Sequence, residues 1–277
     1  MPLAAEHPEL HWSFEAGPIA ALAVGIYLYV RRFRAARREA GGRGAGPLQA
    51  WAFALAMLIL ATALISPLDR LGEDYLFAAH MAQHILLGDI GPLLILLSLS
   101  RVIMRPATRR LHGLERRMGA LASPVTFILI WLGLIYLWHI PALYVGAIDH
   151  APVHALEHVT FFSAGILVWW PLIQPVPMRR PLRGIAPLAY IFSAKVGLGV
   201  LGIYLTWSGS LAYEHYGTLP RIWGLDPIED QNVGGAMMMV EQAVVLVIVL
   251  VVLFARMLRQ SEEEERRRER LEDAAAA

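Results

Sequence analysis

Residues 235–256 read GAMMMVEQAVVLVIVLVVLFAR, a run with a single acidic residue before its closing arginine. A helix needs about 20 mostly apolar residues to cross the hydrocarbon core of a bilayer, so this segment predicts a membrane span. The whole chain agrees, because 57% of its 277 residues are hydrophobic and only 17% are charged. Such a composition is too apolar for an ordinary soluble domain. We therefore predict an all-α membrane protein.

Working outward from this run, seven segments are long and apolar enough to span a bilayer. They lie at 15–31, 48–66, 76–99, 123–141, 151–173, 185–207 and 235–256. We expect one bundle of about seven transmembrane helices over residues 1–257 and a charged tail over 258–277. The tail ends in SEEEERRRERLEDAAAA, which is typical of a solvated helical extension.

The N-terminal sequence MPLAAEHPELHWSFE contains acidic residues and no lysine or arginine. A secretory signal peptide begins with a positively charged region. This segment therefore does not resemble a cleaved signal peptide, and we predict that the first apolar run is retained as a span.

The arginines predict an orientation for the bundle. They follow the first, third, fifth and seventh spans, at 31–43, 101–117, 179–183 and 256–270, whereas the other connections hold only Arg70 and Arg221. Connections rich in arginine and lysine stay in the cytoplasm. The N-terminus is therefore predicted to lie outside and the C-terminus in the cytoplasm.

Charge and cysteine content exclude several kinds of function. The formal net charge is +1, so a nucleic-acid partner is not indicated. The chain has no cysteine, which excludes disulfides, thiolate nucleophiles and cysteine-ligated zinc or iron–sulfur sites. Any metal must be held by histidine, methionine, a carboxylate or the backbone.

Two His-x-x-x-His pairs open two of the predicted spans: HMAQH, with His80 and His84, and HALEH, with His154 and His158. Residues four apart lie on one helix face, roughly 5–6 Å from each other. With the predicted orientation, both pairs lie at the outer ends of their helices and could supply up to four nitrogen ligands to one site. Neutral imidazole suits copper, zinc, iron and nickel. Glu157 could add a ligand or fix an imidazole tautomer.

Other candidate ligands lie at a similar predicted depth. His139 closes the fourth span, and Met237 and Met238 open the seventh. Thioether sulfur suits Cu(I), so a site of histidine and methionine without cysteine favours copper. Three successive methionines point in three directions, so at most two can face one site. Capping or hydrogen bonding is the simpler interpretation of the isolated histidines, His7, His11, His112 and His215.

Two charged residues lie deeper. Asp89 and Lys195 fall within the third and sixth spans at similar depth. A buried ion pair is the expected arrangement, since either charge alone would be costly in the membrane. A role of Asp89 and Lys195 in moving protons or metal is the alternative. A copper transporter is a further alternative, but no series of soft ligands continues to the cytoplasmic side.

Four motifs occur in a characteristic order: HMAQHILLG..GPLL, WHIPALYVGAI, HALEH...WWPL and GLDPIEDQNVGG.MM. Residues 66–240 thereby resemble the multi-spanning CtaG family of cytochrome c oxidase assembly factors. The resemblance implies a bacterial plasma-membrane protein that helps copper reach a haem-copper oxidase. The positions that the family pattern matches are His80, His84, His139, His154, Glu157, His158, Asp230 and Gln231.

The sequence departs from the family pattern at the start of the last span. MMMVEQ stands where the family pattern has an aromatic residue followed by proline or glycine after the methionine. The roles of Met238 and Met239 are therefore not carried over from the resemblance. Glu241 is particular to this chain.

The sequence favours a non-enzymatic protein that binds copper at the outer histidines and passes it to an oxidase subunit. A homodimer is compatible with it. One alternative is a haem-binding electron-transfer protein, because histidines on adjacent helices can supply axial ligands. Another is a zinc metallopeptidase, since HALEH matches H-x-x-E-H with Glu157 as base. That enzyme would need a third ligand, for which Glu214 or Glu241 would be the candidates, and would leave HMAQH unexplained.

Overall fold

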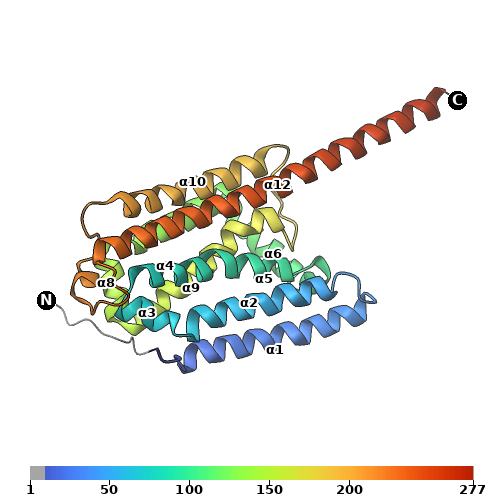
Figure 1. The fold of residues 1–277 in the computed structure, drawn as a ribbon. Helices are drawn as coiled ribbons and strands as arrows, with labels where there is room; N and C mark the ends of the chain where they lie inside the picture. The colour runs from blue at the N-terminus through green and yellow to red at the C-terminus, as the bar shows by residue number, and fades with distance from the viewer. Residues whose placement is uncertain (1–9, 277) are drawn as a thin grey trace.

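Helices form all the regular structure of residues 10–276, the part of the chain that the computed structural model describes. His7 and most of the N-terminal segment discussed above lie outside these residues. The main helices of the bundle run side by side along one direction (Figure 1). They are α1 (Ala16–Glu39), α2 (Pro47–Ile65), α4 (Phe77–Ile85), α5 (Gly91–Ser98), α7 (Pro124–Trp138), α9 (Ala151–Ile173), α10 (Ala186–Trp207) and α12 (Pro227–Ala276).

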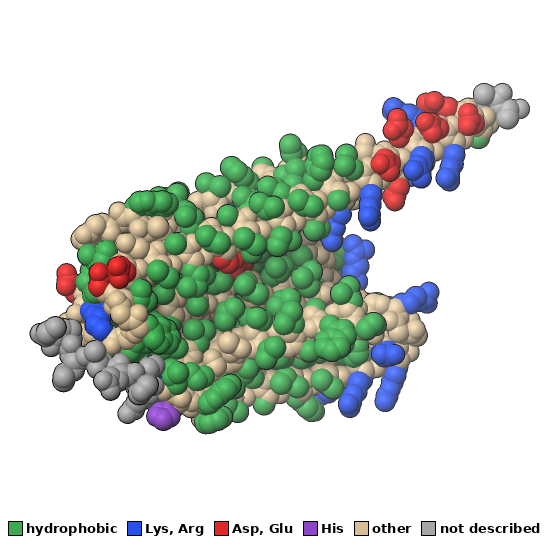
Figure 2. Space-filling model, in the orientation of Figure 1, with side chains coloured by type: hydrophobic (Ala, Val, Ile, Leu, Met, Phe, Trp, Pro, Cys, Tyr) green, Lys and Arg blue, Asp and Glu red, His purple; other side chains and the backbone are tan. Residues whose placement is uncertain are grey.

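Shorter or peripheral helices connect these elements. They are α3 (Leu68–Asp74), the π-helical turn η1 (Leu86–Ile90), α6 (Arg101–Met118), the 3-10 turn η2 (Gly119–Leu121), α8 (Pro141–Asp149) and α11 (Glu214–Thr218). Helices α3 and α8 lie at one end of the bundle (Figure 1). Apolar side chains cover the long face of the bundle that Figure 2 shows, as expected of a surface that faces lipid. The predicted class, an all-helical multi-pass membrane protein, is confirmed.

Five helical segments are long and apolar enough to cross a membrane: 47–74, 77–98, 151–173, 186–207 and 227–275. The pair 101–121 and 124–138, bent by 78°, makes a sixth if it is one span. The prediction of seven also counted α1 and α7 as separate spans. The apolar part of α1 runs directly into Arg31 and Arg32, and α7 has only 15 residues. Length and composition therefore support five or six spans.

The span predicted at 76–99 is interrupted by the π-helical turn η1. Pro92 follows at the start of α5 and has no N–H to donate to the carbonyl of Gly88. The regular pattern of backbone hydrogen bonds in an α-helix is therefore interrupted there. A Cβ at Gly165 of α9 would lie 2.3 Å from this carbonyl oxygen. Glycine thus permits direct contact between α9 and η1, which keeps α4 and α9 close together.

Helix α12 packs against both α10 and α4. A Cβ at Gly235 would lie 2.5 Å from the backbone nitrogen of Thr206, so only glycine allows α12 to approach α10 this closely. The Asp230 carboxylate accepts hydrogen bonds from the backbone N–H groups of Phe77 and Ala78, at 2.7 and 3.0 Å. N–H groups in the first turn of a helix, such as these two of α4, have no acceptor within their own helix. A residue of α12 therefore caps the helix that carries His80.

The arginine-rich segment 101–117 forms the helix α6 rather than an irregular loop. The hydroxyl of Ser100 caps it by accepting from the N–H of Ile103 at 3.2 Å. Arginine side chains gather at the end of the bundle opposite α3 and α8, and α12 continues beyond that end as a charged extension (Figures 1 and 2). The two ends of the bundle thus differ in charge.

Candidate metal centre

The two histidine pairs meet in one buried cluster. The ring centroids lie 4.2 Å apart for His80 and His84 and 4.1 Å apart for His154 and His158. Across the two helices, His80 lies 5.7 Å from His154, and His84 lies 6.0 Å from His158. Helices α4 and α9 therefore bring all four imidazoles together, whereas the spacing in the sequence placed only the two members of each pair side by side.

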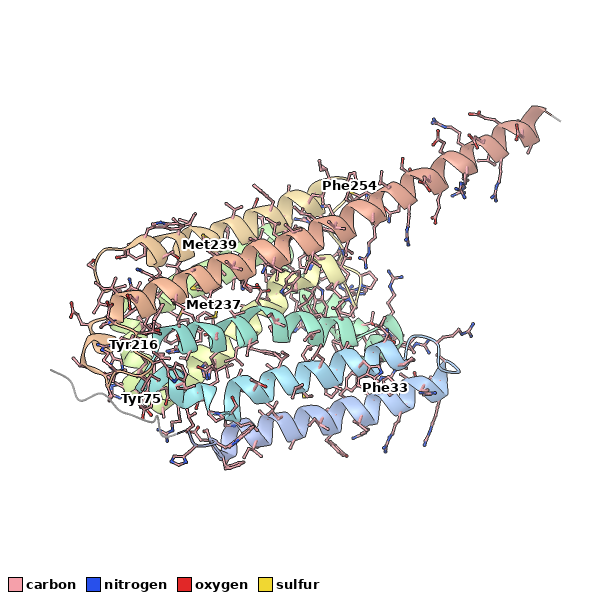
Figure 3. All side chains as sticks on the ribbon, in the orientation of Figure 1. Phe33, Tyr75, Tyr216, Met237, Met239 and Phe254 are labelled. Carbon is pink, nitrogen blue, oxygen red and sulfur yellow. The ribbon has the colours of Figure 1, made fainter. Side chains whose placement is uncertain are left out.

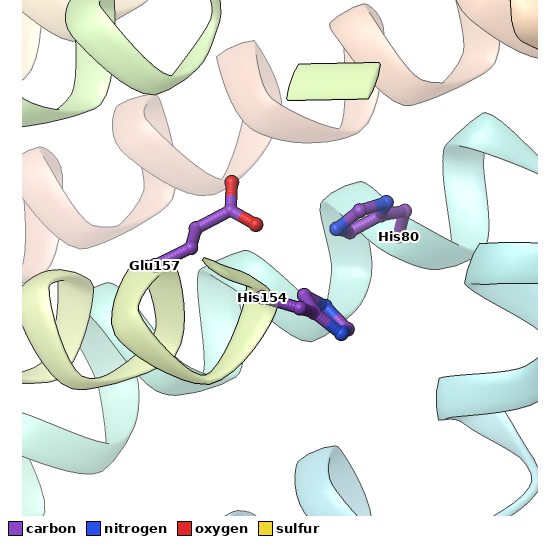
Figure 4. Close-up of side chains that lie close together, drawn as sticks. All are labelled: His80, His154 and Glu157. Carbon is purple, nitrogen blue, oxygen red and sulfur yellow. The ribbon is translucent and has the colours of Figure 1, made fainter. Parts of the chain in front are cut away.

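Glu157 lies within the same cluster. Its side chain is fully buried, and its Oε1 lies 3.7 Å from Nε2 of His84. One ligand atom each from His80, His154 and Glu157 lie within 4.8 Å of one another. The three side chains project toward a common space (Figure 4). Two imidazoles and a carboxylate are thus close enough to bind one cation.

Several polar atoms of the cluster have no hydrogen-bond partner among the described residues. They are Nδ1 of His84, Nε2 of His139, His154 and His158, and both carboxylate oxygens of Glu157. Roughly 90% or more of buried polar atoms in proteins are hydrogen-bonded, and the exceptions often indicate a missing ion or water. Here the unpartnered atoms lie together in the histidine cluster, and the cluster therefore fits a bound ligand.

Two tyrosines orient the ring of His80. The hydroxyls of Tyr144 and Tyr216 lie 2.9 and 3.1 Å from its Nδ1 and 3.0 Å from each other. The Tyr216 hydroxyl also donates to the carbonyl of Gly72 at 2.8 Å. Burial raises the pKa of both tyrosines well above the ordinary value, so both hydroxyls keep their protons.

The proton count in this network determines which nitrogen of His80 is free. Because Tyr216 donates to Gly72, its oxygen accepts from Tyr144, and Tyr144 in turn accepts from Nδ1–H of His80. Nε2 of His80 then has a lone pair and lies 2.9 Å from Nε2 of His84. Two imidazole nitrogens at this distance either share a proton or bind the same cation.

His154 is oriented by a carboxylate that the sequence analysis did not single out. Its Nδ1 lies 2.8 Å from Oε1 of Glu73, near the end of α3. This contact leaves Nε2 of His154 directed into the cluster without a partner. Glu73, rather than Glu157, is thus the acceptor that fixes this imidazole.

The sequence contains weak signals for these supporting residues. Glu73 belongs to the acidic stretch just before HMAQH, and Tyr144 lies within WHIPALYVGAI. Tyr216 lies in the connection 208–226, in α11, at the same end of the bundle as Tyr75 (Figure 3). Their contacts cross between segments that are far apart in the chain, so spacing alone does not reveal them.

A small cavity of about 30 Å³ lies beside the cluster. His84, His139 and Met238 contribute to its wall. The His139 ring centroid lies 6.4 Å from that of His84, and its Nδ1 donates to the carbonyl of Ile135 at 2.8 Å. Met237 is half-buried on α12 (Figure 3) and is not part of this wall. Of the two candidate methionines, only Met238 is buried next to a histidine of the cluster.

The isolated histidines lie elsewhere. His112 lies 3.0 Å from the carbonyl of Pro177, and His215 lies 3.4 Å from the backbone carbonyl of Glu73. His11 lies on a surface hollow beside Arg70. None of these three belongs to the cluster of α4 and α9.

Three comparisons relate the chain to known proteins. Residues 27–260 match the model of the family described as cytochrome c oxidase caa3 assembly factor (Caa3_CtaG), which confirms the resemblance seen in the four motifs. An uncharacterized protein of Mycobacterium leprae is 24% identical over 248 residues, and one of Mycobacterium bovis is 25% identical over 246. Each alignment covers 82% of this chain and 36% of the relative. No solved structure matches.

Proposed function

The chain belongs to the family of cytochrome c oxidase caa3 assembly factors, and we propose that it binds copper at the histidine cluster and passes it to an oxidase subunit. The observation that carries the proposal is the group of buried, unpartnered nitrogen and oxygen atoms on His84, His154, Glu157 and His158. The chain spans just over a third of the length of the mycobacterial relatives. We therefore propose the metal and the oxidase subunit that receives it from this chain's own site.

The donor atoms suit a metal cation. His80, His154 and Glu157 form the central group, with His84 and His158 beside it. Imidazole is a good ligand for copper and zinc, and a thioether such as that of Met238 favours Cu(I). Since the chain has no cysteine, the site lacks thiolates, which would hold copper tightly. Weaker imidazole ligation fits a protein that must release its metal.

Haem and peptidase functions are less well supported by the geometry. The cavity beside the cluster measures about 30 Å³, whereas pockets for organic ligands usually measure ~300 Å³ or more. Glu157 lies among the histidines, where it can bind a cation directly. The family description, an assembly factor, favours a role without catalysis.

The proposed topology has seven spans, counting α1 and α7, with the N-terminus outside and the C-terminus in the cytoplasm of a bacterial plasma membrane. The clustering of arginines at one end of the bundle supports it (Figure 2), because basic connections remain in the cytoplasm. Residues 1–257 then form the membrane domain and 258–277 a cytoplasmic tail. The histidine cluster, near α3 and α8, faces outward, where an oxidase subunit can receive copper.

The test measures the copper content and the absorption spectrum of the purified full-length protein after exposure to copper. We expect roughly stoichiometric copper in the wild type and its loss in a His80→Ala/His154→Ala double variant. His112→Ala is the matched control, because His112 contacts Pro177 instead of the cluster. Equal copper in the double variant and the wild type would overturn the site. Stoichiometric haem absorption would overturn the copper function.

A further inference from the structure

A second polar cluster lies deeper in the bundle. Asp89 on η1 forms the expected ion pair with Lys195 on α10, through Oδ2 and Nζ. The other Asp89 oxygen accepts from the indole N–H of Trp169 at 2.6 Å. The Lys195 ammonium also lies 5.0 Å from the ring of Trp169 and 5.4 Å from that of Trp131, within range for cation–π attraction. Both charged side chains are almost completely buried.

Glu241 on α12 adds a third ionisable group to this cluster. It interacts electrostatically with both Asp89 and Lys195. One of its oxygens accepts from the Gln242 amide, which also donates to Asp89 at 3.3 Å. The other oxygen, Oε1, is buried and has no hydrogen-bond partner among the described residues. The cluster thus contains two carboxyl groups and one ammonium group.

Charge balance requires a proton. With all three groups ionised, the cluster would have a net negative charge within the membrane, where an unpaired charge is energetically costly. The neighbouring helices α7 and α9 contribute the neutral Trp131 and Trp169. Asp89 accepts from Lys195, Trp169 and Gln242, whereas Glu241 accepts from Gln242 alone. Asp89 is therefore the ionised carboxylate and Glu241 the site of the proton.

The cavity of about 30 Å³ also borders this cluster, because its wall includes Asp89 and Gln242 besides His84 and His139. Most of the wall is apolar, and Glu241 is not part of it. Gln242 is 4% exposed and His139 is 8% exposed, and each has a buried polar atom without a partner, Oε1 and Nε2 respectively. A wall of this kind does not favour a water path from Glu241 to the histidines.

We propose that Asp89, Lys195 and Glu241 form a proton-binding site inside the membrane, with one proton held on the carboxyl pair. The proton resides on Glu241, whose Oε1 has no hydrogen-bond partner among the described residues, while Asp89 stays ionised against Lys195. This function does not depend on which metal the histidines bind. The π-helical turn that carries Asp89 fits it, since such turns are frequent at functional sites.

Infrared spectroscopy of the purified, metal-free protein tests the proton. We expect a protonated-carboxyl C=O band that shifts in D₂O and is lost in Glu241→Gln. It is also lost in Asp89→Asn, because Glu241 then pairs with Lys195 as a carboxylate. In Lys195→Met the band gains intensity, since the positive charge is removed. Glu157→Gln, which removes a buried carboxyl of the other cluster, is the matched control and leaves this band in place.

A band that persists unchanged in both Glu241→Gln and Asp89→Asn would overturn the proposal, as would its absence from the folded wild type.

Discussion

At the scale of single residues, the histidine cluster depends on groups that fix each ring. Tyr144 and Tyr216 hold Nδ1 of His80, and Glu73 holds Nδ1 of His154. Both contacts direct Nε2 toward the shared space. Partners of this kind fix the tautomer and make the ligand nitrogen more basic. The affinity of the cluster is therefore expected to depend on residues that do not contact the metal.

Replacing Glu73 with alanine is expected to lower copper affinity about 10–100-fold, because the His154 ring loses its acceptor. Competition with a copper chelator measures the change. Glu73→Gln retains an acceptor oxygen and should recover most of the affinity.

The matched control for this variant is Asp74→Ala. Asp74 is adjacent in sequence but exposed, and it pairs with Arg70 at 3.5 Å. If Glu73→Ala bound copper as tightly as Asp74→Ala, the role of Glu73 in orienting His154 would be disproved.

At the scale of helices, contacts between α12 and α4 determine where the first histidine pair lies. The Asp230 carboxylate satisfies two backbone donors at the start of α4, and Gln231 accepts from the N–H of Ala212 at 2.7 Å. The adjacent Asp230 and Gln231, matched by the family pattern, thus connect three segments at one end of the bundle. Their observed contacts are structural, and they position His80 indirectly.

Asp230→Ala is expected to destabilise the protein by about 0.5–2 kcal/mol, because it removes a capping carboxylate. A lower thermal unfolding midpoint in detergent would reveal this loss. Asp230→Asn keeps one of the two acceptor oxygens that the backbone N–H groups of Phe77 and Ala78 use, so it should recover part of the stability. Equal midpoints for Asp230→Ala and the wild type would contradict the capping role.

At the scale of the whole molecule, the proposed function depends on orientation. The histidine cluster lies toward the end of the bundle that contains α3 and α8, and most arginines lie at the other end (Figures 1 and 2). Copper can pass to an oxidase subunit outside the cytoplasm only if the first end faces outward. The proposed delivery therefore depends on the orientation that the charge asymmetry of the bundle indicates.

Single cysteines can determine the orientation, because the natural chain contains none. We expect a membrane-impermeant maleimide to label Ser210→Cys in intact cells and Ser261→Cys only after permeabilisation. Both positions are exposed, in the 208–226 connection and in the charged tail respectively. The unmodified protein is the unlabelled control. The reverse pattern would place the histidine cluster on the cytoplasmic side and contradict the proposed delivery.

The sequence by itself determined the class of the protein and indicated the two histidine pairs as the proposed ligands. Long apolar runs require helices in a bilayer, because a helix satisfies its own backbone hydrogen bonds there. The i, i+4 spacing likewise places His80 with His84 and His154 with His158, since helix geometry is local. The four family motifs identified the family that the comparison then confirmed.

Only the tertiary structure decided how these local elements meet. Contacts between distant segments occur at three places. Helix α9 approaches η1 at Gly165, and Glu73 and Tyr216 contact the histidines. Glu241 joins the pair of Asp89 and Lys195. Periodicity describes which face a residue occupies on its own helix but not which helix lies opposite. That choice depends on backbone approach distances and buried charge balance, which are properties of the packed bundle.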